Sequence, residues 1–368
     1  MAKRAIVIVL DGCGAGAAPD AAAFNDHENP STLHHVWDAC GGLHTPVLNS
    51  LGWFAAAGVP TEHAITRAGY GRLRPVSMGK DSVTGHWEMM GIETKVAFPT
   101  YPEGFPIALV KRFEQAIGAQ TLGNKPSSGT VILDELGALH MELGCPILYT
   151  SADSVFQLAA HEEIVPLAKL YEWCEIAREL CQTPDNVQRV IARPFVGDPK
   201  GGFKRTQNRK DYPAVPPPNW VDKIGDVFGV GVVPELFGGR GFRSVRRTQS
   251  NVEHAAMLKE AMASDAKFIF ANFEDFDMLY GHRNDPIGFG KCLEEFDLIL
   301  ADVLKGLRPD DVLILTADHG NDPTDASTDH SREFVPWVVV QGTETGNLGD
   351  RDGMQHVGEA VARHLGVR

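Results

Sequence analysis

Six acidic and histidine side chains stand in short polar segments, most of them directly after an apolar run. They are Asp11, Asp277, His282, Asp318, His319 and His330. A single aspartate after a strand is usually a turn former or a helix cap, so none of the six is informative alone. Together, carboxylate oxygens and imidazole nitrogens suit zinc, manganese or iron, and the share of oxygen favours manganese. Because so many ligands exceed what one ion takes, the pattern predicts two divalent ions about 4 Å apart.

A polar stretch rich in glycine, GKDSVTGHWEMMG (79–91), carries the hydroxyl side chains Ser82 and Thr84. It is too polar for a core strand and too rich in glycine for a comfortable helix. A hydroxyl is a poor nucleophile at neutral pH unless a base or a metal lowers its pKa. Near the metal ligands, either Ser82 or Thr84 could therefore attack phosphorus as an alkoxide. The stretch is not a P-loop, because Asp81 stands where that motif has Ser or Thr.

Three apolar segments precede the polar groups and are expected to position them. They run over 5–10, 267–273 and 311–316. Continuous apolar runs of this length are typical of strands buried on both faces, as in a parallel sheet covered by helices. Residues 290–307 show helical periodicity and would supply such cover. Ligands collect at the carboxyl ends of strands in open α/β sheets, which is where these acids and histidines stand.

Two proline-rich joints divide the chain into a core and an insert. They are FPTYPEGFP at 98–106 and YPAVPPP at 212–218. Proline runs stiffen the backbone and break regular elements, as connections between domains require. We therefore expect a metal-binding catalytic core domain from 1–97 and 219–368. Residues 98–218 are expected to form an inserted cap domain that contacts the substrate.

Bulk composition restricts the classes of partner. The 368 residues, 43% of them hydrophobic, suffice for two domains with sizeable cores. A formal net charge of −14 argues against nucleic acid or an anionic membrane as the partner, but not against a small anionic substrate. No apolar run approaches the roughly 20 residues of a membrane helix. The six cysteines are scattered, which favours reduced thiols and a cytoplasmic protein.

Several long motifs resemble those of phosphopentomutases, bacterial enzymes of the alkaline phosphatase superfamily. They are LDGCGAGAAPDA, GKDSVTGHWEMMG, YTSADSVFQLAAHEE, RVIARPFVGDP, NFEDFDMLYGHRND, LTADHGNDP and TDHSRE, and they span nearly the whole chain. The resemblance implies an alkaline-phosphatase-like α/β core, mainly parallel and flanked by helices, with a smaller inserted α/β cap. It also implies interconversion of ribose (or deoxyribose) 1-phosphate and 5-phosphate, two Mn²⁺ ions, a phosphorylated hydroxyl residue and a sugar bisphosphate as activator.

The resemblance also assigns roles to residues. It implies that Asp277, His282 and His330 hold one ion, and that Asp11, Asp318, His319 and the nucleophile hold the other. The family has a threonine directly after Gly-Lys-Asp, where this sequence has Ser82. Ser82 keeps the hydroxyl and is the expected nucleophile, with Thr84 as the second candidate.

Substrate residues are expected in the insert. Residues 193–211 hold six basic and two acidic side chains, and a solvated basic loop would be the ordinary interpretation. By resemblance, substrate contacts are expected from Ser151, Asp153, Arg189, Arg193 and Arg205, because an arginine fork matches phosphate and a carboxylate accepts sugar hydroxyls. His161 is explained as well by packing.

One position departs from the family pattern. Val232 occupies the place of a lysine that meets substrate phosphate, and Lys223 imitates that motif but comes too early in the sequence. Two explanations are open: Arg240 or Arg243 compensates for the lysine, or the substrate differs. The leading hypothesis is thus a pentose phosphomutase. The alternatives are a metal-dependent phosphatase, a phosphomutase for another sugar phosphate, and a non-catalytic sugar-phosphate sensor, which would have lost ligands or nucleophile.

Overall fold

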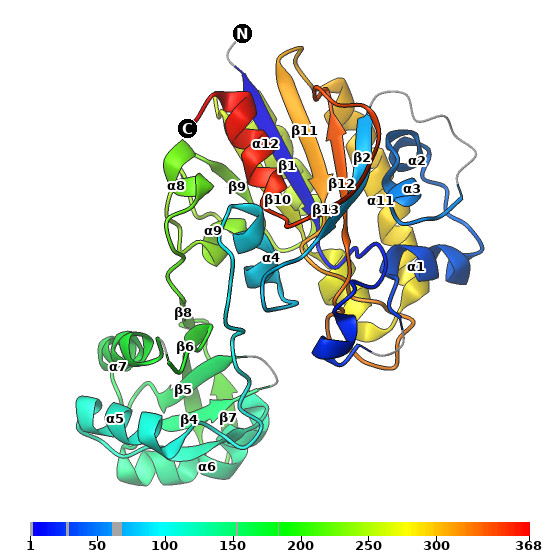
Figure 1. Cartoon of the computed structure of the whole chain (residues 1–368). Coiled ribbons are helices and arrows are strands. Elements are labelled where there is room, and N and C mark those ends of the chain that lie inside the picture. The colour runs from blue at the N-terminus through cyan, green and yellow to red at the C-terminus, as the bar shows by residue number, and fades with distance from the viewer. Residues whose placement is uncertain (1–2, 27–28, 61–67, 152–153, 183) are drawn as a thin grey trace. The chain divides into compact units, whose positions relative to one another are not determined.

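The computed structural model describes residues 3–26, 29–60, 68–151, 154–182 and 184–368. These residues form two compact units, which are described separately (Figure 1). Unit 1 comprises residues 1–97 and 216–368, and unit 2 comprises residues 98–215. The functions expected of the core and the insert remain predictions.

Unit 1 is built on a seven-stranded sheet in the order β13-β2-β12-β11-β1-β10-β9. The strands are β1 (Arg4–Leu10), β2 (Ala68–Arg74), β9 (Phe228–Val230), β10 (Phe268–Phe273), β11 (Asp311–Thr316), β12 (Val335–Val340) and β13 (Gly346–Asp352). The neighbours β9, β10, β1 and β11 are parallel, and β12 runs antiparallel to both β11 and β2. All three predicted strands are present, within one residue of their expected bounds.

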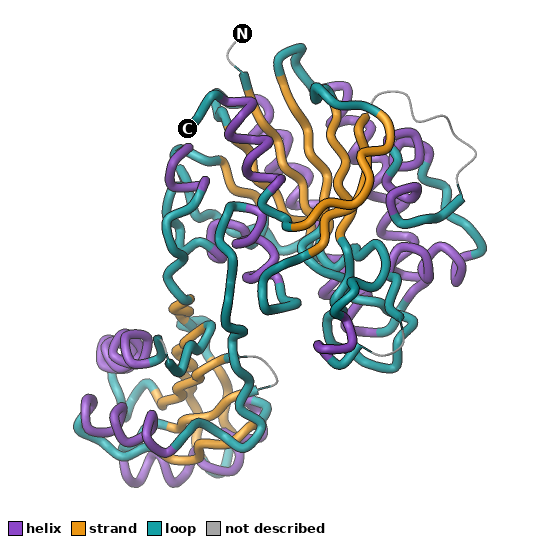
Figure 2. The backbone as a smooth tube through the Cα atoms, in the orientation of Figure 1, coloured by secondary structure: helices purple, strands orange, loops and turns teal. Residues whose placement is uncertain are grey.

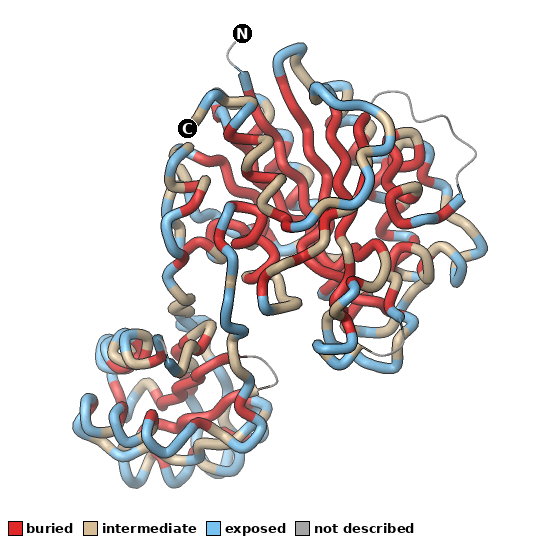
Figure 3. The backbone as a smooth tube through the Cα atoms, in the orientation of Figure 1, coloured by how far each residue is buried: buried red, intermediate tan, exposed pale blue. Residues whose placement is uncertain are grey.

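Helices flank this sheet. The α-helices of unit 1 are α1 (Thr32–Cys40), α2 (Pro46–Leu51), α3 (Trp53–Ala56), α4 (Ser82–Met89), α8 (Trp220–Ile224), α9 (Val233–Leu236), α10 (Asn251–Ala263), α11 (Pro286–Lys305) and α12 (His356–Leu365). Helix α12 packs on β1 and β11, and α10 packs on β10 and β9, so the strands are buried along their length (Figure 3). The predicted α/β class with a mainly parallel sheet is confirmed.

Helix α11 starts at Pro286, four residues before the range 290–307 that was predicted from its apolar periodicity. Pro286 occupies its first turn, where a missing N–H costs nothing, and Asp285 caps it by accepting a bond from the N–H of Gly288. Three short turns complete unit 1: the 3-10 helices η1 (Ala21–Phe24) and η3 (Gly281–Arg283) and the π-helical turn η2 (Phe276–Tyr280). Among the described residues, no helix combines the length and apolarity needed to cross a membrane.

Unit 2 is a smaller α/β body with its own sheet in the order β3-β4-β5-β6-β7, with β8 also paired to β6 (Figure 2). Its elements are α5 (Ile107–Ile117), β3 (Leu122–Pro126), α6 (Gly129–Leu143), β4 (Ile147–Thr150), β5 (Val155–His161), α7 (Leu167–Leu180), β6 (Arg189–Asp198), β7 (Gly202–Arg205) and β8 (Lys210–Pro213). Apolar residues of α5 and α7 cover one face of the sheet in a single buried cluster. Phe156 on β5 lies at the centre of that cluster, with ring centroids 4.8 Å from Phe105 and 5.1 Å from Phe113.

Phe156→Ala is expected to destabilise unit 2 by about 3–5 kcal/mol, because it removes a fully buried ring and leaves a cavity. Val131→Ala on α6 is the control, since Val131 is 57% exposed and its truncation should change stability by less than about 0.5 kcal/mol. Hydrogen exchange read by mass spectrometry should show lost protection in peptides from 98–215. Equal loss throughout unit 1 would contradict an independent core in unit 2.

Candidate metal centre

Parallel pairing brings the predicted ligands to one edge of the sheet in unit 1. Strand β1 is in register with β10 up to the pair Leu10–Phe273, and with β11 up to the pair Val9–Thr316. The residues that follow these three strands therefore leave the sheet together at its carboxyl edge. This register explains how ligands more than 250 positions apart in the sequence form one cluster.

The first group of ligand atoms consists of Asp11, Asp318 and His319, all at most 3% exposed. His319 Nε2 lies 3.4 Å from Asp11 Oδ1 and 3.3 Å from Asp318 Oδ2. Neither of these two carboxylate oxygens has a hydrogen-bond partner among the described residues. Buried oxygens without a donor are costly unless a cation binds them, so these residues fit a divalent metal ion.

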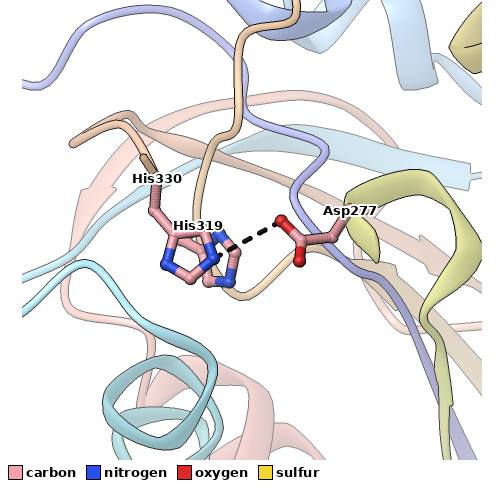
Figure 4. Close-up of side chains that lie close together, drawn as sticks. All are labelled: Asp277, His319 and His330. Carbon is pink, nitrogen blue, oxygen red and sulfur yellow. Dashed lines mark ion pairs between the residues drawn. The ribbon is translucent and has the colours of Figure 1, made fainter. Parts of the chain in front are cut away.

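The second group surrounds Asp277 on η2. His282 Nε2 lies 3.1 Å from Asp277 Oδ2, His330 Nε2 lies 3.5 Å from Asp277 Oδ1, and the two imidazole nitrogens lie 3.2 Å apart. Two ring nitrogens and a carboxylate thus converge on one point. Figure 4 shows that His319 also faces this group, and its ring centroid lies 3.9 Å from that of His330. His319, which was expected to bind only the first ion, therefore lies between the two groups. Its ligand atom is within 4.8 Å of those of Asp277 and His330.

In His282 and His319, a contact at Nδ1 leaves Nε2 available to bind a metal ion. His282 Nδ1 lies 2.7 Å from the carbonyl oxygen of Thr328, and His319 Nδ1 lies 3.1 Å from that of Gly320. A ring that donates through Nδ1 presents the lone pair of Nε2 to a metal ion. The chain thereby fixes both tautomers before any ion binds.

The electrostatics of the cluster follow from burial and from like charges. Burial raises the pKa of Asp11 well above its usual value, and the neighbouring carboxylates of Asp318 and Asp277 raise it further. Burial also disfavours the Asp318 carboxylate, but the imidazoles of His319 and His86 outweigh this and bring its pKa to about 2. A divalent ion between these groups would relieve the repulsion between the carboxylates.

The glycine-rich stretch 79–91 is a helix from Ser82 onward, contrary to its low propensity. Asp81 caps α4 by accepting a bond from the N–H of Thr84. A Cβ atom at Gly85 would lie 2.2 Å from the carbonyl oxygen of Asp318, so only glycine allows α4 to pack directly on the loop that carries Asp318. Tertiary contact at this position outweighs propensity.

The two candidate hydroxyls have different surroundings. Ser82 Oγ lies 3.1 Å from His319 Nε2, inside the ligand cluster. Thr84 is 2% exposed, and its hydroxyl donates to Asp81 Oδ2 at 2.7 Å. Ser82 therefore faces the metal centre, whereas Thr84 completes the helix cap.

Two asparagines that orient ligands were missed from the sequence. Asn272 Nδ2 donates to Asp11 Oδ2, and Asn321 Nδ2 donates to Asp277 Oδ1, both at 2.6 Å. Asn272 is the one amide in the apolar run FIFANF of β10, and a buried polar residue there needs a partner. That isolated polar position was the available signal.

The residues expected to bind substrate lie in unit 2. Arg193 on β6 donates through Nε to Gln157 Oε1 at 3.0 Å, and Arg189 Nη1 lies 3.4 Å from Asp211 Oδ2. Arg205 ends β7 beside the N-terminus of α6, so close that a Cβ atom at Gly129 would overlap its guanidinium.

Three further residues of unit 2 are Tyr149, Ser151 and His161. Burial raises the pKa of Tyr149, and the positive charges of Arg205 and Arg193 oppose that shift. Ser151 follows β4, and Asp153 lies outside the described residues. His161 is 1% exposed, and its Nε2 lies 2.9 Å from the carbonyl oxygen of Gly197, which is the packed role considered for it.

Val232 comes two residues after the end of β9, on the carboxyl edge of the sheet in unit 1. Its N–H donates to Glu274 Oε1 at 2.6 Å. Lys223 precedes β9, and its ammonium group lies over the ring of Trp220, 4.3 Å from the centroid. Arg240 pairs with Asp222, and Arg243 pairs with Asp226 and Asp265, so both arginines considered as substitutes already have carboxylate partners.

Comparison with known proteins shows that the chain is similar to metalloenzymes. A family model described as "Metalloenzyme: Metalloenzyme superfamily" matches residues 221–368, which include five of the six predicted acidic and histidine ligands. The phosphopentomutase of Dictyoglomus thermophilum is 48% identical, covering 100% of this chain and 95% of the relative. That of Carboxydothermus hydrogenoformans is 46% identical, over 99% and 96%.

A solved structure, the PH0037 protein from Pyrococcus horikoshii, aligns with a TM-score of 0.52 at 17% identity, covering 100% of this chain and 98% of that one. At this low identity, the similarity indicates a shared fold and nothing about activity.

Asp11→Asn is expected to stabilise the metal-free protein and to weaken Mn²⁺ binding. The amide removes one of three crowded carboxylate charges, and its oxygen can still accept from Asn272. In EDTA, urea unfolding should show a gain of about 1 kcal/mol or more. Asp38→Asn, at a side chain that is 68% exposed, is the control and should change neither property. A destabilised metal-free protein that binds Mn²⁺ like the wild type would contradict this account of the cluster.

Proposed function

The chain belongs to the phosphopentomutase family, and from this premise we propose that it interconverts ribose (or deoxyribose) 1-phosphate and 5-phosphate through a phosphoenzyme at Ser82. The observation that carries the proposal is the position of Ser82. Its hydroxyl lies 3.1 Å from His319 Nε2, in a cluster of buried carboxylates and imidazoles. A nucleophile beside a divalent metal site is what phosphoryl transfer requires.

Two Mn²⁺ ions are proposed as the cofactors, because the ligand set is rich in hard oxygens. Asp11, Ser82, Asp318 and His319 would hold one ion, and Asp277, His282 and His330 would hold the other. When bound, the ions lower the pKa of a coordinated hydroxyl and neutralise charge on the phosphoryl oxygens. The distances among the described ligand atoms support this division, with His319 adjacent to both groups.

Ser82 is proposed as the nucleophile in preference to Thr84. The hydroxyl of Thr84 is buried and already donates to Asp81, so its attack would break the cap of α4. Ser82 is the first residue of α4 and points its hydroxyl at the ligand cluster. Backbone N–H groups at a helix N-terminus also favour a phosphoryl group placed there.

The proposed reaction has two transfers. In the first, the phosphoryl group leaves Ser82 Oγ and bonds to the free hydroxyl oxygen of the sugar monophosphate, whose proton moves to Ser82. This gives a sugar bisphosphate. In the second, Ser82 Oγ bonds to the other phosphoryl group and gives up its proton, which passes to the sugar oxygen that this group leaves. The same bisphosphate, added as an activator, would recharge an enzyme that has lost its phosphoryl group to water.

Substrate binding by the insert is part of the proposal. Arg205 lies at the N-terminus of α6 in unit 2, where a guanidinium group and a helix terminus offer a site for a phosphate group, and Arg193 is proposed to contribute from β6. Ser151 and Asp153 are proposed to contact sugar hydroxyls, and Arg189 is proposed to contact phosphate. Exclusion of water from the phosphoenzyme is the role proposed for the insert as a cap.

A related activity on a different sugar phosphate is the second candidate. It is favoured by one observation: where the family resemblance puts a lysine, Val232 donates its N–H to the buried carboxylate of Glu274. A carboxylate at this edge of the sheet would repel a phosphate group that a lysine would attract. The substrate could then carry an uncharged group at this end.

Ser82→Ala is expected to lower the rate by at least ~10³-fold, because it removes a covalent nucleophile. Ser82→Thr keeps the hydroxyl and should retain measurable turnover. Thr84→Ala should lose less than about tenfold, the size of an effect on a helix cap and not on chemistry. Mass spectrometry of peptides after incubation with ribose 1,5-bisphosphate should place the phosphate on Ser82. A phosphate on Thr84 in the wild-type protein would overturn the assignment.

Val232→Lys is expected to lower KM for ribose 5-phosphate by about tenfold or more, the effect of one charge-assisted phosphate contact of roughly 1.5–3 kcal/mol. Val232→Met is the matched control, because it adds length without charge. An equal KM in the two variants would show that position 232 does not meet the phosphate. If wild type and both variants accept phosphate on Ser82 but are inert with ribose and deoxyribose phosphates, the pentose assignment is wrong.

A further inference from the structure

Arg332 lies two residues after the predicted ligand His330 and is almost completely buried, with 1% of its surface exposed. Its guanidinium donates to three backbone carbonyl oxygens of one short stretch: Pro75 at 2.8 Å, and Ser77 and Gly79 each at 2.7 Å. This stretch leads directly into the proposed nucleophile. One side chain therefore binds the backbone of the whole loop before α4.

The same guanidinium is held from its other side. Asp20 accepts from Nε at 3.2 Å and from Nη2 at 2.9 Å, and the ring of Phe24 stacks on the guanidinium with 4.4 Å to its centroid. The planar fork of arginine presents donors in fixed directions, which a lysine cannot reproduce. The guanidinium group that binds the loop therefore has little conformational freedom of its own.

A second link joins the same two segments. Asp26 Oδ2 accepts from the N–H of Arg332 at 2.6 Å, and Asp26 Oδ1 accepts from Lys80 Nζ at 2.9 Å. Lys80 Nζ also lies 3.2 Å from Asp329 Oδ2, next to His330 in the sequence. The segment that carries a metal ligand and the loop that carries Ser82 are therefore connected at two places.

The loop has no regular structure to hold it otherwise. Strand β2 ends at Arg74 and α4 begins at Ser82. The carboxylate of Glu88 accepts from the N–H groups of Val76 and Ser77, so Glu88 binds donors of the loop while Arg332 binds its acceptors. Buried carbonyls without a donor would be costly, and the loop would move to regain water or other partners.

We propose that Arg332 is a positioning residue that fixes Ser82 relative to the metal ligand His330. It acts through the loop 75–79, without touching the reacting atoms. The inference rests on the proposed role of Ser82. A displacement of about 1 Å at a nucleophile is enough to lower a rate roughly a hundredfold, while ground-state binding of the substrate is little affected.

The test compares Arg332→Lys with Arg4→Lys in the full-length protein. Arg4 is the matched control, because it is also 1% exposed and also binds a carboxylate, Asp311, and a backbone carbonyl, that of Met262. It stands at the opposite end of β1, seven residues before Asp11 and thus about 20 Å away. Both substitutions replace a buried guanidinium by an ammonium group, so both should lower thermal stability.

Four quantities are measured on both variants: kcat and KM with ribose 1-phosphate, bound Mn²⁺ per chain, and amide hydrogen exchange in residues 76–82. Arg332→Lys should lower kcat roughly ten- to a hundredfold, leave KM within about twofold and keep the bound Mn²⁺. Its exchange in 76–82 should become faster. Arg4→Lys should leave all four quantities close to wild type. Guanidinium chloride at millimolar concentration should restore part of the kcat of Arg332→Gly.

The inference is overturned if Arg332→Lys keeps the wild-type kcat, or if both variants lose kcat equally, since the loss would then reflect stability. If the wild-type protein does not isomerise ribose 1-phosphate, the proposed function fails, and hydrogen exchange alone decides the inference. Faster exchange of 76–82 in Arg332→Lys only would support it. Equal exchange in both variants would overturn it.

Discussion

The structure of unit 1 depends on the burial of three carboxylates, Asp11, Asp277 and Asp318, at one edge of a parallel sheet. Buried acids of like charge repel one another and lose their hydration, so the fold must supply positive or donating groups around them. Histidines and asparagines from neighbouring loops, from helix α4 and from strand β10 do so in part. Two oxygens remain without a donor among the described residues, and a bound cation would satisfy them.

This constraint explains why the surrounding loops are held so firmly. Every acidic and histidine candidate ligand stands on a loop or a short turn, where the backbone alone does not fix its position. Buried side chains from distant segments do this instead: Arg332 binds the carbonyls before α4, and Glu333 accepts from the N–H groups of Gly16 and Thr32. Burial raises the pKa of Glu333 to about 7, a cost that its four donors offset in part. Arg332 and Glu333, which follow His330 closely in the sequence, thus anchor two different loops: the loop before α4 and the segment before α1.

Much of this arrangement could be predicted from the sequence. The apolar runs of β1, β10 and β11 are continuous because both faces are buried, and their bounds follow from the polar residue that ends each run. The candidate ligands follow from residue type and from their place after the strands, and the structure brings them close together. The roles of Asn321 and Arg332 could not be predicted, because each depends on a partner brought close only by the tertiary fold. The helix at Ser82–Met89 was missed for the same reason, since its glycine packs on the loop of Asp318.

The most direct test of the account is a ³¹P NMR spectrum of ribose 1-phosphate incubated with the Mn²⁺-loaded protein and a trace of ribose 1,5-bisphosphate. The account predicts that the resonance of ribose 5-phosphate grows to an equilibrium level while inorganic phosphate stays at the level of a protein-free sample. Release of inorganic phosphate without ribose 5-phosphate would show a phosphatase and contradict the account. An unchanged spectrum would contradict it as well.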